Sequence, residues 1–123
     1  MNAQVNIKEM MEKFAETTRV SIKRIENTKD DGYVLWFAKS KLAVTDFTDT
    51  AGKNVRCCLV SDAVIFTQDE LDSIEKYNAP MPSIANSNGE WATLISVKKA
   101  KKLQIEKLQQ ELANFEKYEG AGA

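Results

Sequence analysis

The segment Tyr33–Ala38 (YVLWFA) limits what this chain can fold into more than any other part of it. In an extended strand, odd-numbered and even-numbered residues point to opposite faces of a sheet. Both sets are apolar here, with Val34 and Trp36 on the even-numbered face. A strand that is apolar on both faces must be covered on both. We therefore expect helices from the two ends of the chain to cover one face, and a second layer or a second copy of the protein to cover the other.

The length and charge of the chain indicate one domain without a global attraction for charged partners. A chain of 123 residues fits a single domain that can build a core without disulfides or a structural metal. Its net charge of −1 means that any anion site must be a local patch. The first residues lack the apolar centre of a signal peptide, and no run approaches the roughly 18 apolar residues of a membrane helix. We expect a cytoplasmic protein without a membrane partner.

The N-terminal region has the spacing of an amphipathic helix. Apolar or small residues recur on one side of it at Ile7, Met11, Phe14 and Thr18. The β-branched residues that follow favour a strand over Arg19–Ile25, although this segment would also continue the helix through its two isoleucines. We prefer the strand.

Asp31-Gly32 is a hairpin-type turn signal, because glycine takes a positive φ without steric cost. Polar or short connections then separate four predicted strands: Tyr33–Ala38, Leu42–Phe47, Val55–Val60 and Ala63–Phe66. Short connections favour antiparallel neighbours, so these strands should form a meander.

The sequence around Thr67 carries the best-defined local signal. Thr67 as N-cap, followed three residues later by Glu70, forms a capping box that starts a short helix. This helix should end near Tyr77, before Ala79-Pro80-Met81-Pro82, because proline disfavours the helical conformation of its predecessor.

Two interpretations compete just before the last helix. Ser87 and Glu90 could form a second capping box that starts one long helix. Asn88-Gly89 is instead typical of a hairpin turn, and the residues after it alternate as a strand up to Val97. We prefer the strand, because the helical alternative places lysines where apolar residues are needed. Either way, Lys99–Lys117 should be helical.

Together these elements predict an α+β fold. An antiparallel β-meander of four to six strands packs with an N-terminal helix, a short middle helix and a longer C-terminal helix. Residues 1–119 form one domain, and residues 120–123 form a disordered tail. The size and the lack of motifs would suit a small virus-encoded or accessory protein.

The sequence offers little for catalysis. Histidine is absent, which removes the commonest general base and the usual metal ligand. Asp46, Asp49 and Asp62 lie at strand ends or in loops, where acidic residues are also common for turn chemistry alone. The adjacent Cys57 and Cys58 point to opposite faces of a strand, which favours reduced, buried thiols over a disulfide, with a reactive thiol as the alternative. We expect no metal, no cofactor and no enzymatic activity.

A cluster of lysines with no acid among them is the sharpest charged feature: Lys98, Lys99, Lys101 and Lys102. If the last helix begins near Ser96, these lysines occupy its first turns, where the helix dipole is already positive and a bound anion would relieve the repulsion. Trp91 lies just upstream and could stack a nucleotide base. If the helix begins near Ser87 instead, the cluster is a solvated helix face.

An apolar stripe of the last helix is formed by Ile105, Leu108, Leu112 and Phe115. It can pack on the chain's own sheet or on another subunit, since two heptads are too few to identify a coiled coil. The strand face with Val34 and Trp36 also needs cover, because large exposed apolar patches are uncommon on monomers. We expect a homodimer or higher oligomer with these six residues at its interface, while favouring burial of Trp36 over a role as a partner anchor.

We therefore expect a small, non-catalytic, oligomeric binding or regulatory protein that acts through contacts with itself and with an unidentified protein partner. The alternative is a binder of a nucleotide or nucleic acid through the lysine cluster and Trp91. A small enzyme that uses loop carboxylates is the third hypothesis.

Overall fold

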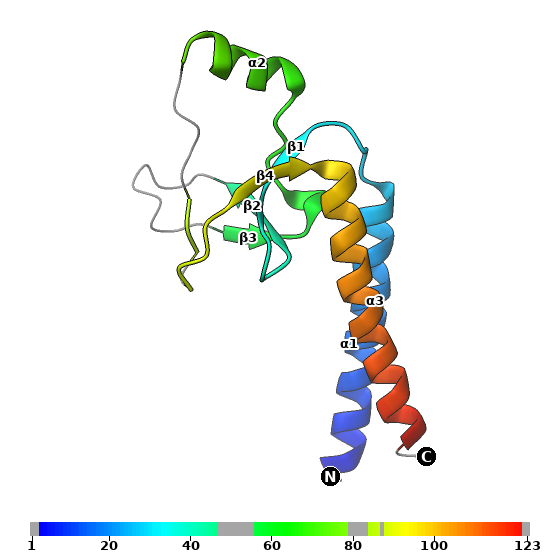
Figure 1. Ribbon diagram of the computed structural model, residues 1–123. Coiled ribbons are helices and arrows are strands. Elements are labelled where there is room, and N and C mark those ends of the chain that lie inside the picture. The colour runs from blue at the N-terminus through cyan, green and yellow to red at the C-terminus, as the bar shows by residue number, and fades with distance from the viewer. Residues whose placement is uncertain (1–2, 47–55, 79–83, 87, 122–123) are drawn as a thin grey trace.

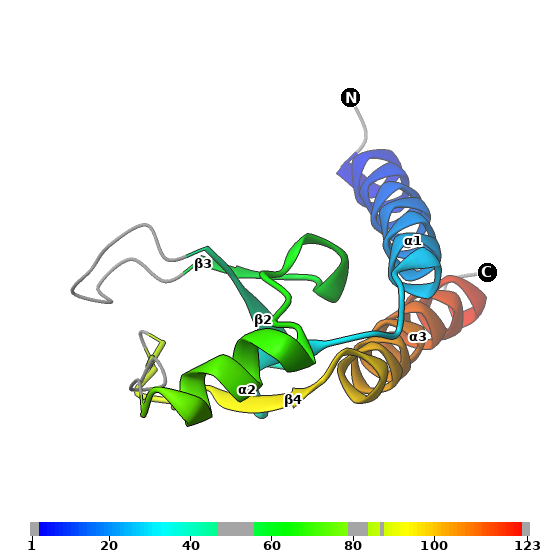
Figure 2. The ribbon, with the colours of Figure 1, turned by 90° about the horizontal axis from the view of Figure 1, so that it is seen from above.

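The computed structural model describes residues 3–46, 56–78, 84–86 and 88–121 (Figure 1). Within these residues, three α-helices accompany one four-stranded antiparallel sheet, so the predicted α+β class is confirmed. Two long helices, α1 (Ala3–Asn27) and α3 (Val97–Ala121), run antiparallel, with the sheet at one end of the pair. The view from above places the sheet on one side of this helix pair (Figure 2). The free end of the pair, with both chain termini, extends well beyond the sheet.

The N-terminal helix continues through the segment for which the sequence favoured a strand. α1 includes Arg19–Ile25, so the strand prediction was wrong. Ala15, Ile22 and Ile25 are buried on one face of α1, at spacings of about two turns and one turn. β-Branched residues lower helix propensity only slightly, and burial of such a face outweighs that cost.

The sheet has the strand order β3-β2-β1-β4, and each neighbouring pair is antiparallel. Its strands are β1 (Tyr33–Phe37), β2 (Leu42–Asp46), β3 (Arg56–Cys58) and β4 (Thr93–Ser96). The first three confirm predicted strands, whose ends at Phe47 and Val55 lie outside the described residues. β4 pairs with β1, with Leu94 opposite Leu35.

No strand covers Ala63–Phe66, all four of which the structure describes, so this prediction was wrong. The chain instead leaves the sheet in a short 3-10 helix, η1 (Val60–Asp62). The buried Gln104 of α3 holds this turn, because its Oε1 accepts a hydrogen bond from the Val60 N–H at 2.8 Å. Phe66 then returns to form an isolated bridge with Tyr33.

Both faces of β1 are covered by the chain itself. The even-numbered face, with Val34 and Trp36, packs against Val60 of η1 and against Val97 and Ala100 of α3. The odd-numbered face belongs to a second cluster, which contains Leu35, Phe37, Val44 and Ile84. Within the described residues, both faces of β1 are therefore covered by a second layer of the same chain and not by a second copy of the protein.

The short helix α2 (Gln68–Lys76) begins at the predicted capping box. Thr67 is its N-cap, and the Thr67 Oγ1 accepts a hydrogen bond from the Glu70 N–H at 3.1 Å. The helix ends with Tyr77 at the C-cap and Asn78 at a φ of 51°. The proline-containing segment 79–82, which the sequence predicted as the helix stop, lies outside the described residues. None of the residues of α2, all of them described, is buried.

The last strand and the last helix meet at Ser96. The strand preferred before this point is confirmed as β4, and Ser96 Oγ caps α3 by accepting a hydrogen bond from the Lys99 N–H at 3.2 Å. α3 includes Gly120 and Ala121, which the sequence assigned to the tail, while residues 122–123 lie outside the described part. In that part of the chain, no helix is long and apolar enough to cross a membrane.

Candidate functional site

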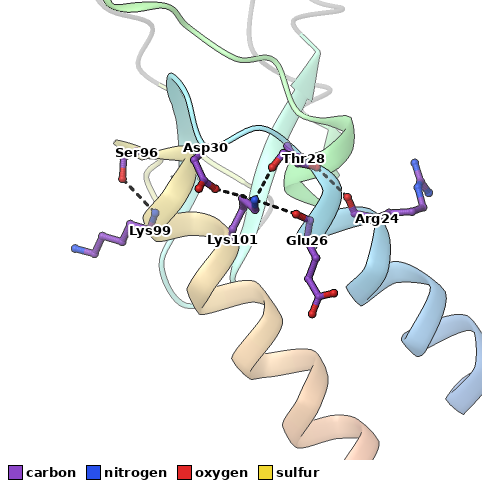
Figure 3. A network of polar contacts seen from close by, with 7 residues as sticks. All are labelled: Arg24, Glu26, Thr28, Asp30, Ser96, Lys99 and Lys101. Carbon is purple, nitrogen blue, oxygen red and sulfur yellow. Dashed lines mark hydrogen bonds and ion pairs between the residues drawn. The ribbon is translucent and has the colours of Figure 1, made fainter.

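Lys101, one of the four clustered lysines, is occupied by structural contacts (Figure 3). Its Nζ donates to the backbone oxygens of Glu26, at 3.3 Å, and of Thr28, and forms an ion pair of 2.7 Å with Asp30. It thereby satisfies carbonyl groups at the C-terminal end of α1, and 13% of its side chain stays exposed. The hydrogen bond from Lys101 lowers the pKa of Asp30, and the charge of Lys98 adds to this effect.

The other three lysines of the cluster, Lys98, Lys99 and Lys102, are exposed on the first turns of α3. The helix start at Val97 therefore gives the cluster the position that an anion site would need. Trp91 is 65% exposed and lies just before β4, whereas the lysines follow that strand. A site that joins Trp91 to the lysines stays a prediction.

Glu90 has a structural role that the sequence did not reveal. Its carboxylate accepts hydrogen bonds from the Lys39 N–H, from the Ser40 N–H at 3.3 Å, from the Ser40 hydroxyl at 2.9 Å and from the Asn86 side-chain amide at 3.2 Å. Burial alone would raise the pKa of Glu90, but these hydrogen bonds outweigh it and lower the pKa. Glu90 therefore anchors the turn between β1 and β2 to the segment before β4, a pairing for which the sequence contains no local signal.

Of the three loop carboxylates, Asp62 alone has a side chain that the structure describes. Asp62 of η1 forms an ion pair of 2.7 Å with Arg24 of α1, and both side chains are about half exposed. The side chain of Asp46 and all of Asp49 lie outside the described residues. In the part of the chain that the structure describes, no cluster of three or more acidic, cysteine or histidine side chains could hold a metal ion.

The two cysteines are free, but their environments differ from the expected one. Cys57 is exposed and Cys58 is half-buried, so burial of Cys57 was a wrong prediction. The reason is that β3 is an edge strand of the sheet. Burial raises the pKa of both thiols. The carboxylate of Glu90 adds to this for Cys57, whereas for Cys58 a hydrogen bond with Thr45 lowers the pKa in part and the carboxylate of Asp62 raises it. A raised pKa reduces the thiolate fraction at neutral pH, which does not favour the reactive-thiol alternative.

Two of the predicted interface residues lie in the interior. Trp36 is 2% exposed and Val34 is fully buried, both packed against residues of the same chain. The expected burial of Trp36 is confirmed, and neither side chain is accessible to a partner in this fold.

The stripe of α3 contacts the other long helix through Phe115. Its four members, Ile105, Leu108, Leu112 and Phe115, are all partly buried. The Phe115 ring stacks on the ring of Phe14 of α1, with the centroids 6.4 Å apart and the planes 7° from parallel. Arg19 and Glu116 form an ion pair of 3.8 Å between the same helices. Packing against the chain's own α1 is an arrangement that the sequence reasoning did not weigh.

A group of apolar side chains on α1 remains uncovered at the free end of the helix pair. Ile7, Met10 and Phe14 are 51%, 56% and 54% exposed, and spacings of three and four residues place them on one side of the helix. We call these three residues the α1 stripe. A shallow hollow beside it is lined by Met10, Lys13, Phe14 and Thr17. The sequence placed Ile7 and Phe14 on the packed face of this helix and did not single out Met10.

Comparisons of this chain with protein-family models, with curated proteins and with solved structures found no match.

Proposed function

We propose that this chain is a small, non-catalytic binding protein that acts through protein–protein contacts, and that the free end of the α1–α3 pair makes them. One observation carries the proposal: three large apolar side chains of the α1 stripe are each more than half exposed, side by side. Exposed apolar groups that gather on one surface are typical of contact sites. Met10 at the centre suits such a site, because a flexible thioether adapts to the shape of a partner.

The polar groups that the sequence put forward for chemistry support the same proposal. Lys101 is occupied with the end of α1, Asp62 with Arg24, and Glu90 with the turn between β1 and β2. Each of these groups stabilises the fold, while the α1 stripe contributes few contacts to it. The free cysteines suit a reducing compartment, and we propose the cytoplasm as the site of action.

The experiment compares three tagged baits expressed in the native host: wild type, Met10→Glu and Lys23→Glu. Lys23 is the control because it is exposed on the same helix but is turned by about 180° from Phe14. We expect wild type and Lys23→Glu to retain one protein in stoichiometric amount, either a second copy of the chain or another protein. We expect Met10→Glu to lose it. If all three baits retain the same proteins, or if none retains any, the proposal is wrong.

Binding of a nucleotide or nucleic acid is a second candidate function, favoured by the start of α3 at Val97. This start leaves the exposed Lys98, Lys99 and Lys102 on adjacent turns, where two of them can reach one phosphate. Lys98→Glu/Lys102→Glu should abolish any binding of single-stranded oligonucleotides that wild type shows at low salt, and added salt should weaken that binding. Wild-type protein that binds no nucleotide and no oligonucleotide at low salt removes this candidate.

A further inference from the structure

The free end of the helix pair is a two-helix layer with one side uncovered. Within this layer, the stacked rings of Phe14 and Phe115 and the Arg19–Glu116 ion pair join the two helices. Each helix can bury only one strip against a single neighbour. The three side chains of the α1 stripe are each more than half exposed, so the described residues leave that stripe without full cover. A second layer of helices would provide it, as in a four-helix bundle.

We infer that a second copy of this chain covers the α1 stripe, in an antiparallel arrangement related by a twofold axis near residue 12. This inference rests on the proposed function and names its partner. The sheet is attached at one end of the helix pair (Figure 1), so antiparallel association places the two sheets at opposite ends and keeps them apart. The axis brings Met10 of each copy onto Phe14 of the other, and Ile7 onto Thr17. The hollow beside Met10 then receives a side chain from the second copy.

Charge complementarity favours a second copy over an unrelated partner. Lys13 lines the hollow at the outer edge of the stripe, and Glu9 lies one turn before it on the same edge. An antiparallel twofold axis reverses the order of these charges in the second copy. Lys13 of each copy then lies about 3 Å along the helix axis from Glu9 of the other copy, an offset that these long side chains can span. A patch that carries both signs in this order is self-complementary, which is what an interface between identical subunits requires.

The size of the layer sets the expected affinity. From Ala3 to Ser21 the layer is about 27 Å long, and two helices are roughly 20 Å wide. It therefore offers on the order of 500 Å² per copy, about 1,000 Å² in total, which is near the lower limit for a specific interface. The dimer should accordingly form at micromolar rather than nanomolar concentration.

The experiment is sedimentation velocity of the purified full chain over a range of micromolar concentrations. We expect wild type and Lys23→Glu to change from monomer to dimer over this range. Met10→Glu should stay monomeric, with an affinity lower by roughly a hundredfold or more, because it buries two unpaired carboxylates. Circular dichroism should show the same helix content in all three proteins. A wild type that stays monomeric overturns the inference.

Charge reversals test the antiparallel order. Glu9→Lys and Lys13→Glu should each weaken the dimer roughly five- to tenfold, because like charges then face each other twice per dimer. The double variant Glu9→Lys/Lys13→Glu should regain association, and a mixture of the two single variants should form heterodimers. Double and single variants that are equally weak would contradict this arrangement.

The two proposals fail in different ways. Suppose that purified wild type is monomeric but that its bait retains a different host protein, which the Met10→Glu bait loses. This result overturns the inference that a second copy covers the α1 stripe and leaves the proposed binding function standing. A wild type that is monomeric and retains no protein overturns both.

Discussion

The sheet end and the free end of the helix pair both carry phenylalanine side chains, but the two ends bury these side chains to different extents. Phe37 of β1 is fully buried, whereas Phe14 of α1 is 54% exposed although its ring stacks on another phenylalanine. Phe37 belongs to a cluster with residues of β2 and of the segment before β4, while Phe14 has one helix beside it. For two residues of the same type, the exposed fraction therefore depends on the number of layers around the side chain.

The largest expected effect comes from truncating an aromatic side chain in each region. Trp36→Ala should lower the free energy of unfolding by about 3–5 kcal/mol, because it empties a large buried volume. Phe14→Ala should cost about 1 kcal/mol or less in the monomer, because much of that ring is already in water. Urea denaturation at a concentration below dimer formation measures both. Equal losses at the two positions would remove the contrast between the regions.

A buried polar contact at the sheet end should give the next largest effect. Gln104 accepts from the Val60 N–H at 2.8 Å, and its amide donates to the Lys41 oxygen at 3.0 Å. Gln104→Met keeps the volume but leaves these backbone groups without partners, which should cost about 2–3 kcal/mol. The matched control is Gln110→Met, further along the same helix, where Gln110 bonds only the exposed Asn114 in the described structure. We expect this control to change stability by less than about 0.5 kcal/mol, as measured in the same urea titration.

A smaller effect is expected where the helix pair joins the sheet. Lys101→Met should cost about 1–2 kcal/mol, because the carbonyl groups at the end of α1 lose a charged donor. Lys102→Met, the exposed neighbour, should leave stability within about 0.5 kcal/mol of wild type. Thermal denaturation of the two variants side by side measures the difference. Two equal losses would mean that Lys101 acts as a surface charge and not as a cap.

The smallest effect is a pH dependence at the same junction. The pKa of Asp30 is lower in the folded protein than in the unfolded chain, so its contribution to stability is present above its ordinary value of about 3.9. That contribution is lost as the pH falls through the lower folded pKa, where the carboxylate is protonated. Asp30→Asn should therefore be less stable than wild type at neutral pH, and the two melting temperatures should converge in acid. A difference that stays constant down to low pH would contradict the ion pair with Lys101.

Elements with a strong local signal could be predicted from the sequence. The capping box at Thr67 and Glu70 placed the start of α2, and the alternation in Tyr33–Phe37 placed β1 with two buried faces. The helix over Lys99–Lys117 followed from its periodicity. In each case residues close together in the chain carry the information, because hydrogen bonds within a helix turn and side-chain alternation along a strand are local properties.

The errors arose where distant residues decide. The β-branched residues of Arg19–Ile25 favoured the prediction of a strand. In the structure, Ile22 and Ile25 are instead buried in a helix that packs along α3. The sequence predicted a strand over residues 63–66, yet Gln104, 44 positions after Val60, helps to hold the preceding turn through its hydrogen bond with the Val60 N–H. The candidate site was missed for the same reason, since an apolar helix face gives no sign of how far along the helix its partner reaches.

The sequence by itself determined the fold class, the position of the short helix and the need to cover both faces of β1, because periodicity and capping depend on neighbours in the chain. Only the tertiary structure decided that Lys101 is a structural cap, that Trp36 is interior and that Ile7, Met10 and Phe14 face water. Each of these outcomes depends on which segment lies opposite, and that is a property of packing between distant elements. The exposed α1 stripe exists because the helix pair is longer than the sheet that covers its other end.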